Sequence, residues 1–287
     1  MINPLLGVAC ADALGMPFEM MKHNDPRLLA WDGESFLDPH GSHLRGVIRA
    51  GQWTDDTQMT LCLAEALIEA RGYDLDLTAK KYLAWYQSGL ARGTGPSIKA
   101  AMEAMARGAR PEAAGVDGAT GTGTAMRAIP LGVYPFQDAG QFRVSCRVDA
   151  QITHRSPEAV KAATKVAELA QRLLHPADHW QWLRVSQAQV RRNPLTIPEM
   201  IALEEETALT QGTGLALYAA ANHCFFATDS FKDAIRLTIR MGGDTDTRGA
   251  IVGGWAGIRY GVPADWARQV EDHERILDIE AQLLGAG

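Results

Sequence analysis

The sequence predicts an all-α protein that folds as a single compact multi-helix domain over residues 1–287. Three observations predict this class. Apolar residues recur with a helical period in almost every long segment, no alternating strand pattern extends beyond a few residues, and no linker divides the chain. The length is compatible with one domain, because single cores stop growing at roughly 250–300 residues.

The helices are expected in order along the chain. The N-terminal run MINPLLGVACADALG contains an A-x-A-like triplet but lacks the basic start of an export signal, so we interpret it as a helix of the folded protein. In TQMTLCLAEALIEARG an apolar stripe from Met59 to Ala70 covers one face, and Gly72 follows where a C-terminal cap is expected. Similar stripes predict helices within residues 77–89, 97–108, 156–174, 179–190, 198–209, 214–228 and 230–243.

Some helical positions carry specific expectations. Trp180 and Trp182 are two residues apart and cannot share one helical face, so one is expected in the core and the other at the surface or an interface. The acidic run at 204–206 is expected to be a solvated helix face. Binding groups are expected instead in three irregular segments, residues 31–56, residues 108–124 and the turn at 242–247, because loops on a rigid scaffold often carry them.

Composition excludes several classes of protein. The net charge of -6 and the pI near 5.8 give none of the basic surface that nucleic-acid binding requires, so charge alone predicts no nucleic-acid partner. No apolar run is long enough to span a bilayer. Four scattered cysteines without a Cys-x-x-Cys pair indicate buried reduced thiols and a cytoplasmic location.

Two acidic clusters of the same kind precede predicted helices. One is GGDTDT at 242–247 and the other is GQWTDDT at 51–57. Helix capping is one interpretation, because Thr and Asp side chains accept the free N–H groups of a first turn. Capping does not require two Asp and two Thr at each of two helix starts, and like charges placed together repel unless a cation lies between them. Both interpretations therefore stay open at this point.

If the two clusters converge, their chemistry indicates a particular class of metal. Carboxylates and hydroxyls are hard oxygen ligands, and without His or Cys beside them they favour Mg²⁺, Mn²⁺ or Ca²⁺ over zinc. Convergence of both clusters would form a two-metal site with ions roughly 3.5–4 Å apart.

Four further segments accompany the clusters in order: Asp12-Ala13-Leu14-Gly15 with Pro17-Phe18-Glu19, then GTGTAMR at 121–127, THRSP at 153–157, and Gly253-Gly254-Trp255. This ordered set, which spans nearly the whole chain, resembles the ADP-ribosylglycohydrolase family, the dinitrogenase-reductase-activating-glycohydrolase-like or ADP-ribosyl-acceptor hydrolases. The resemblance implies an all-α fold holding two divalent cations, Mg²⁺ or Mn²⁺. It implies metal-site roles for Thr54, Asp55, Asp56, Asp244, Asp246 and Thr247, while Thr57 and Thr245 are expected to point away or cap.

The resemblance also implies a reaction and its catalytic residues. The family hydrolyses the bond between C1 of the distal ribose of ADP-ribose and an acceptor atom. Glu19 resembles the glutamate placed near that bond, and its apolar neighbours would raise its pKa toward that of a usable acid, although a solvated loop carboxylate is the alternative. Asp55 or Asp56, shared between metal and water, is expected to act as the base.

The GTGTAMR segment is the candidate pyrophosphate cradle, because glycines let backbone N–H groups approach phosphate oxygens closely. Its expected substrate-binding residues are Gly121, Thr122, Gly123, Thr124 and Met126. The family more often has Asn at the position of Thr122 and Gly at that of Ala11; the first difference affects substrate identity, the second helix packing.

His154 has two interpretations, a packed or capping residue and a residue that lines the substrate pocket. With an ordinary pKa of about 6.5, it would be the group that shapes activity near neutral pH.

The sequence thus predicts a Mg²⁺- or Mn²⁺-dependent hydrolase that removes ADP-ribose from a modified acceptor, with arginine favoured. The expected partner is an ADP-ribosylated protein or a small ADP-ribose conjugate, and a nucleic acid is expected only if it is itself ADP-ribosylated. Two alternatives stay open, a non-catalytic ADP-ribose-binding protein on the same fold and a two-metal phosphoester or pyrophosphate hydrolase. Neither the metal preference nor the oligomeric state follows from the sequence.

Overall fold

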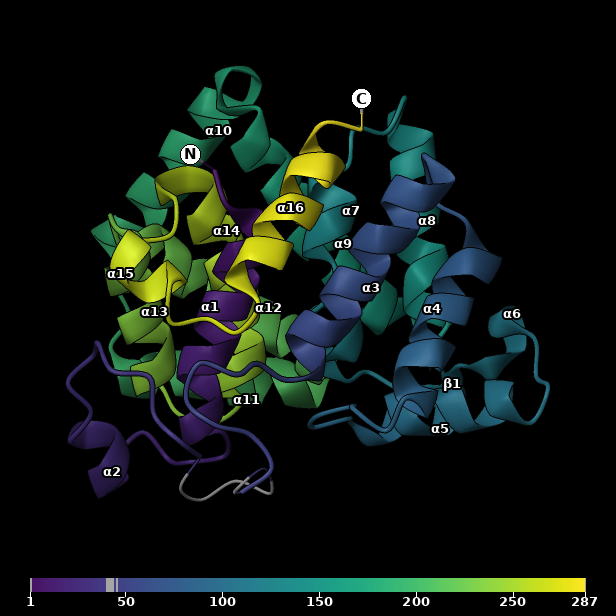
Figure 1. Ribbon diagram of the computed structural model, residues 1–287. Coiled ribbons are helices and arrows are strands. Elements are labelled where there is room, and N and C mark those ends of the chain that lie inside the picture. Colours follow the sequence, from purple (N-terminus) through teal and green to yellow (C-terminus); the bar gives the residue numbers. More distant parts are fainter. Residues whose placement is uncertain (1, 40–43, 45, 287) are drawn as a thin grey trace.

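Helices provide nearly all the regular structure, and α1 runs through the middle of the molecule (Figure 1). The computed structural model describes residues 2–39, 44 and 46–286. Its α-helices are α1 (Pro4–Gly15), α2 (Pro26–Leu29), α3 (Asp55–Ala70), α4 (Leu75–Gln87), α5 (Pro96–Ala106), α6 (Pro111–Ala114), α7 (Ile129–Val133), α8 (Ala139–Gln151), α9 (Pro157–Leu174), α10 (Pro176–Arg192), α11 (Ile197–Gln211), α12 (Thr213–Ala227), α13 (Phe231–Arg240), α14 (Thr245–Tyr260), α15 (Ala264–Ala267) and α16 (His273–Leu284). Two 3₁₀ turns, η1 (Met16–Phe18) and η2 (Thr122–Thr124), and two short strands, β1 (Val116–Asp117) and β2 (His154–Arg155), complete the elements of the described residues.

The all-α class predicted from the sequence is confirmed, with local differences. The sequence pattern did not single out α8, whose buried face includes the polar residues Ser145 and Asp149 and so hides its period. It also missed the parallel pair of β1 and β2, two residues each, which is too short to show alternation. At the end of α3 the left-handed residue is Arg71 rather than Gly72, which follows it.

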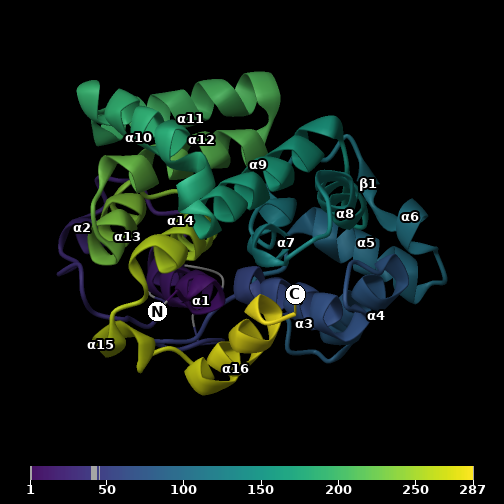
Figure 2. The same cartoon turned by 90° about the horizontal axis from the view of Figure 1, so that it is seen from above.

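The centre of the fold is the pair formed by α1 and α14, which cross with their backbones in close approach (Figure 2). A Cβ built on Gly7 would lie 2.2 Å from the carbonyl oxygen of Gly253, and one built on Gly253 would lie 2.2 Å from that of Gly7. Only glycine permits this contact. Every residue of α1 is buried, as expected for a helix that is apolar on all sides.

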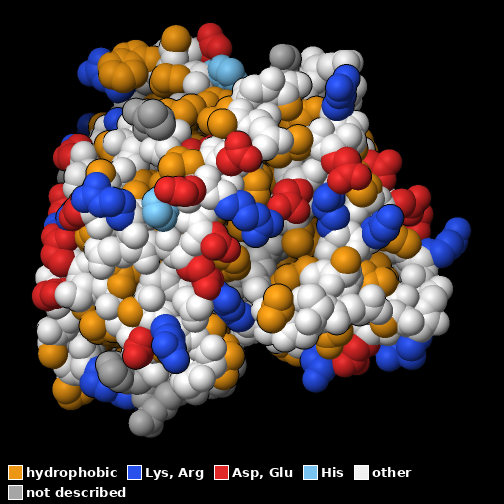
Figure 3. Space-filling model, in the orientation of Figure 1, with side chains coloured by type: hydrophobic (Ala, Val, Ile, Leu, Met, Phe, Trp, Pro, Cys, Tyr) orange, Lys and Arg blue, Asp and Glu red, His pale blue; other side chains and the backbone are white. Residues whose placement is uncertain are grey.

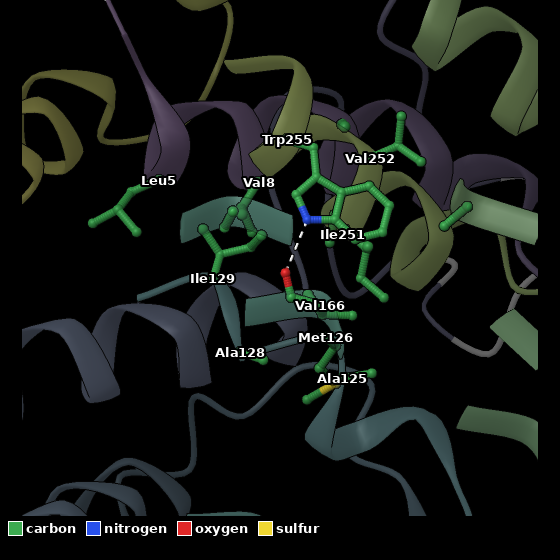
Figure 4. Packing of buried hydrophobic residues seen from close by; sticks show 14 of the residues in the cluster. Leu5, Val8, Ala125, Met126, Ala128, Ile129, Val166, Ile251, Val252 and Trp255 are labelled. Atoms are coloured by element: carbon green, nitrogen blue, oxygen red, sulfur yellow. Dashed lines mark hydrogen bonds between the residues drawn. The ribbon is translucent and has the colours of Figure 1, made fainter. Parts of the chain in front are cut away.

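Trp255 of α14 joins this central pair to α9. Its indole Nε1 donates a hydrogen bond of 3.0 Å to the carbonyl oxygen of Val166, and its ring is fully buried (Figure 4). Val8 of α1 and Ile129 of α7 lie in the same apolar layer. Buried aromatic rings whose polar atom is satisfied fix the relative position of the helices around them.

The surface differs from the sequence-based expectation at α10. Hydrophobic side chains gather over this helix at the top of the molecule (Figure 3), where Trp180 and Trp182 are both exposed, at 57% and 39%. The expectation that one of the two lies in the core is wrong, because the buried position of α10 is taken by Leu183. Among the described residues no helix has the length and apolarity needed to cross a bilayer.

Candidate active site

The two acidic clusters line one cavity of about 230 Å³. Asp55 begins α3 and Asp244 precedes α14, so the two helices point their N-termini at the same space. The acidic side chains that line it are those of Glu19, Asp55, Asp56, Asp244 and Asp246, with Thr247 beside them. The convergence that the sequence could not show is therefore present in the structure.

Helix α1 holds both clusters, and Asp12 is its key residue. The buried carboxylate of Asp12 accepts hydrogen bonds from the backbone N–H of Thr54, at 3.0 Å, and of Thr57, at 3.2 Å. It also accepts from both threonine hydroxyls, at 3.1 and 2.6 Å. At the other cluster, the Thr245 hydroxyl donates to the carbonyl oxygen of Gly15 at 2.8 Å. The sequence motif containing Asp12 was recognised, but this role was missed.

The threonines of the clusters divide into two kinds. Thr57 and Thr245 turn their hydroxyls to α1, in agreement with the expectation that they point away. Thr54 caps α3 through Asp56 N–H, and its hydroxyl is shared between Asp12 and Asp56 rather than lining the cavity. Thr247 does line it. Capping and cavity formation are thus combined in the first cluster, whereas Asp244 precedes α14 without a capping hydrogen bond from its side chain.

The cavity is strongly acidic. No Lys or Arg is present among the described residues that line it. Burial raises the pKa of Asp55, Asp56 and Asp246 well above the ordinary range, and the neighbouring carboxylates raise it further. Burial, and then Asp244, raises the pKa of Glu19 to about 7. Burial and mutual repulsion therefore disfavour the charged forms of these aspartates unless a cation compensates them.

The donor set fits a hard divalent cation. Asp56 Oδ1 is a buried carboxylate oxygen without a hydrogen-bond partner, although such atoms are nearly always satisfied. The other acidic side chains of the lining also offer carboxylate oxygens, which are the ligands that Mg²⁺ and Mn²⁺ prefer. The described side chains do not, however, bring three His, Cys, Asp or Glu groups together as a ready-made ligand set. Like-charged carboxylates that lack a cation between them are expected to stand apart.

The glycine loop lies against His154 at the same cavity. Gly121, Thr122, Gly123 and Met126 line it, and a Cβ on Gly123 would lie 2.9 Å from His154 Cε1. The fifth candidate of this loop, Thr124, is not part of the lining. Its hydroxyl donates to the carbonyl oxygen of Ala159 on α9, at 3.0 Å, and so anchors the loop from behind.

His154 lines the cavity, but its ionisation differs from the expectation. It lies on β2, which pairs with β1, and is only 3% exposed. Burial, and then the charge of Arg127, lowers the pKa of His154 to about 3. The expectation that this imidazole titrates near neutral pH is therefore wrong, because the sequence shows neither the burial of the ring nor the buried arginine behind it.

Known proteins resemble this chain in sequence and in structure. A model of the ADP-ribosylglycohydrolase family matches residues 2–287. The chain belongs to this family. It is 27% identical to the ADP-ribosylarginine hydrolase Tri1 of Pseudomonas putida (strain GB-1), over 97% of this chain and 76% of the relative. It is 25% identical to the ADP-ribosyl-(dinitrogen reductase) glycohydrolase of Rhodospirillum rubrum, over 100% and 96%. A solved structure of an ADP-ribosylglycohydrolase-related protein complex superposes with a TM-score of 0.76 at 28% identity, covering 99% and 96%.

The cavity has further features that the sequence did not predict. Gly93 and Gly95, in the loop that leads into α5, and Ser97, in the first turn of that helix, line the acidic cavity. A second cavity, of about 740 Å³, shares Met20, Gly121, Thr122 and Asp244 with the first.

The wall of this second cavity corrects the expectation for Glu204, whereas Glu205 and Glu206 of the same acidic run are exposed, as expected. Glu204 is paired with the buried Arg248, Nη2 to Oε2 at 2.9 Å, so this glutamate is not part of a solvated face. The signal in the sequence was Arg248, a cation directly after GGDTDT that has to find a partner when buried.

Proposed function

We propose that this chain is a hydrolase that releases ADP-ribose from a modified acceptor by cleaving the bond at C1 of the distal ribose, with arginine as the acceptor. Family membership supports the reaction, and the names of two relatives, an ADP-ribosylarginine hydrolase and an ADP-ribosyl-(dinitrogen reductase) glycohydrolase, support a protein acceptor. The observation that carries the proposal is the single cavity in which carboxylates from two distant helix starts meet a glycine loop.

We further propose that the cavity binds two divalent cations, Mg²⁺ or Mn²⁺. Asp55, Asp56, Asp244, Asp246 and Thr247 line it, and Thr54 lies directly behind with its hydroxyl on Asp56. The unpartnered Asp56 Oδ1 supports a cation at this point. When bound, such cations would hold the ribose diol, lower the pKa of a water molecule and keep the aspartates ionised.

The protein's own residues supply the proton transfers. Hydrolysis forms a bond between a water oxygen and C1 and breaks the bond from C1 to the acceptor nitrogen. Glu19, whose pKa is raised to about 7, carries a proton near neutral pH and donates it to the leaving nitrogen. Asp55 or Asp56 accepts the proton that the attacking water loses. Gly121 and Gly123 leave room for the backbone to approach the diphosphate.

The test is release of ADP-ribose from an arginine-ADP-ribosylated peptide, detected by mass spectrometry with Mg²⁺, with Mn²⁺ and with chelator. We expect metal-dependent release that is lost in Asp56→Ala. The matched control is Asp74→Ala, which removes an aspartate that caps α4 through Leu77 N–H but lies outside the cavity lining. If both variants retain full activity, or if chelator has no effect, the proposal is wrong.

The product separates this function from the two alternatives. Free ADP-ribose indicates glycohydrolase chemistry, whereas AMP with ribose phosphate would indicate attack at phosphorus. Tight binding of ADP-ribose without any turnover in the presence of metal would indicate a binding protein. No release from the arginine-linked peptide, but release from a serine-linked, base-linked or small-molecule conjugate, would keep the reaction and change the acceptor.

A further inference from the structure

Arg127 is a fully buried residue that joins the glycine loop to the strand carrying His154. Its Nε donates to Asp149 Oδ2 at 3.0 Å and its Nη2 to the Asp149 carbonyl oxygen at 2.8 Å. Its Nη1 donates to the carbonyl oxygen of Gly123 at 2.7 Å and to Thr153 Oγ1 at 3.0 Å. One guanidinium therefore fixes both the loop and residue 153 from behind the cavity.

The Thr153 hydroxyl connects Arg127 to the imidazole of His154. It is completely buried, and the hydrogen bonds of the described residues give it two partners, Arg127 Nη1 and His154 Nδ1, the latter at 2.9 Å. A hydroxyl has one proton and two acceptor positions, and a guanidinium can only donate. Arg127 thus occupies an acceptor position, which leaves the hydroxyl proton to be placed.

The imidazole offers the place for that proton. If His154 Nδ1 carried its own proton, the two protons would compete and the buried hydroxyl of Thr153 would be left without an acceptor, which is costly. We propose that Thr153 donates to His154 Nδ1, and that Arg127 and Thr153 thereby hold His154 as the neutral tautomer with its proton on Nε2. Arg127 and Thr153 are positioning residues in this arrangement.

The protonated nitrogen faces the glycine loop. A Cβ built on Gly121 would lie 3.1 Å from His154 Nε2, so this edge of the ring lies directly against the loop. An Nε2–H group there donates to an acceptor-only oxygen, as in a diphosphate, whereas a bare Nε2 would present a lone pair and repel it. The lowered pKa of His154 agrees with a neutral ring. The assignment of a diphosphate rests on the proposed function, but the tautomer does not.

The first test reads the tautomer in the ligand-free protein. The eight histidines are labelled with ¹⁵N, and two-bond ¹H–¹⁵N correlations show which ring nitrogen carries the proton. The His154 signals are assigned by their loss in His154→Gln. We expect the Nε2–H pattern in the wild type and in Thr153→Ser, which keeps the hydroxyl. In Thr153→Val, of similar shape but without the hydroxyl, we expect a mixture of tautomers or the Nδ1–H form.

A wild-type signal from the Nδ1–H tautomer or from imidazolium at neutral pH would overturn the proposal. So would an unchanged tautomer in Thr153→Val. If Thr153→Val does not fold, the wild-type spectrum still decides, because only one of the two tautomers agrees with the proposal.

The second test measures binding of free ADP-ribose by calorimetry. A hydrogen bond to a charged acceptor corresponds to roughly a ten- to hundredfold change in affinity. We expect that loss in His154→Ala, and in Thr153→Val a smaller loss that follows the fraction of rings without the Nε2 proton in its spectrum. We expect His154→Gln, whose amide places an N–H near the Nε2 position, to bind more tightly than His154→Ala. Equal affinity of the Gln and Ala variants would contradict the donor role. If the wild type does not bind ADP-ribose at all, the proposed function fails while the tautomer remains decided by its spectrum.

Discussion

Stability should depend on pH through Glu280, a buried carboxylate far from the acidic cavity. Glu280 lies on α16 and is 2% exposed. Its Oε2 accepts from the backbone N–H of Leu5, at 2.7 Å, and of Leu6, at 3.2 Å, while its Oε1 accepts from Asn3 Nδ2 at 3.0 Å. It therefore accepts hydrogen bonds from backbone N–H groups in the first turn of α1, where the N-cap residue Asn3 makes no capping hydrogen bond with its side chain.

Two effects of opposite sign act on this carboxylate. The N-terminus of α1 favours the charged form by about 0.3–1 kcal/mol, and up to about 2 kcal/mol when partly buried. Burial disfavours the charged form and is the larger effect, so the pKa of Glu280 rises from 4.5 to about 7. A group whose pKa is raised on folding contributes full stability below its unfolded pKa and loses that contribution as pH rises through the folded value. At 1.36 kcal/mol per pKa unit, the loss between pH 4.5 and pH 8 is about 3 kcal/mol.

The assay is urea unfolding of the wild type and of Glu280→Gln at pH 5 and pH 8, with chelator present to remove any contribution from metal. The variant keeps an acceptor for Leu5 and Leu6 without a titratable charge. We expect similar free energies of unfolding at pH 5 and a variant more stable by about 3 kcal/mol at pH 8. The other buried carboxylates titrate in both proteins, so they cancel in the difference. A difference that does not change with pH, or a variant that is less stable at pH 8, would refute the reasoning.

Four further predictions concern the cavity and its supports. Glu19→Gln should lower kcat by about 10²–10⁴-fold, and it should remove the fall in wild-type kcat/KM that we expect as pH rises through about 7 and the acid loses its proton, measured as a pH–rate profile. Asp12→Ala removes the acceptor shared by the Thr54 and Thr57 segments and should lower turnover by about 10²-fold with secondary structure intact by circular dichroism; unchanged turnover would contradict its positioning role. Gly253→Ala places a Cβ 2.2 Å from a carbonyl oxygen of α1 and should cost about 1–3 kcal/mol in urea unfolding. Because the pKa of His154 is lowered to about 3, this imidazole should not titrate near pH 6.5. The pH–rate profiles of the wild type and of His154→Gln should therefore show the same inflections around that pH.

What could be predicted from the sequence were features carried by neighbouring residues. The stripe that begins at Met59 marks the buried side of α3 through Leu63, Ala66 and Leu67, although its last member, Ala70, is exposed. The clusters at 54–57 and 244–247 predict helix starts, because the residue types that favour a helix N-terminus act on adjacent residues. Their meeting in one cavity was expected only from the resemblance to a family, since no local rule brings residues almost 200 positions apart together.

What could not be predicted depends on partners that are distant in the sequence. The role of Asp12 follows from Thr54 and Thr57 on another helix, and nothing next to Asp12 indicates it. The low pKa of His154 comes from burial and from Arg127, while the pairing of Glu204 comes from Arg248. In each case the side chain has an ordinary sequence context, and the fold decides its charge and its contacts.

A count of charges explains why the fold alone leaves the acidic cavity incomplete. The N-termini of α3 and α14 both face it, and each contributes about half a positive elementary charge, or about one in total. Against this stand the five carboxylates of the lining, with no Lys or Arg among the described residues there. The remaining charge of about four has to be neutralised by protons, as the raised pKa values of Asp55, Asp56 and Asp246 indicate, or by cations. The proposed acid Glu19 holds one such proton, which leaves a charge of about three; one divalent ion would neutralise two of it, and two ions would neutralise all of it. This count supports the divalent cations that we propose for the cavity, where α1 brings both helix starts together.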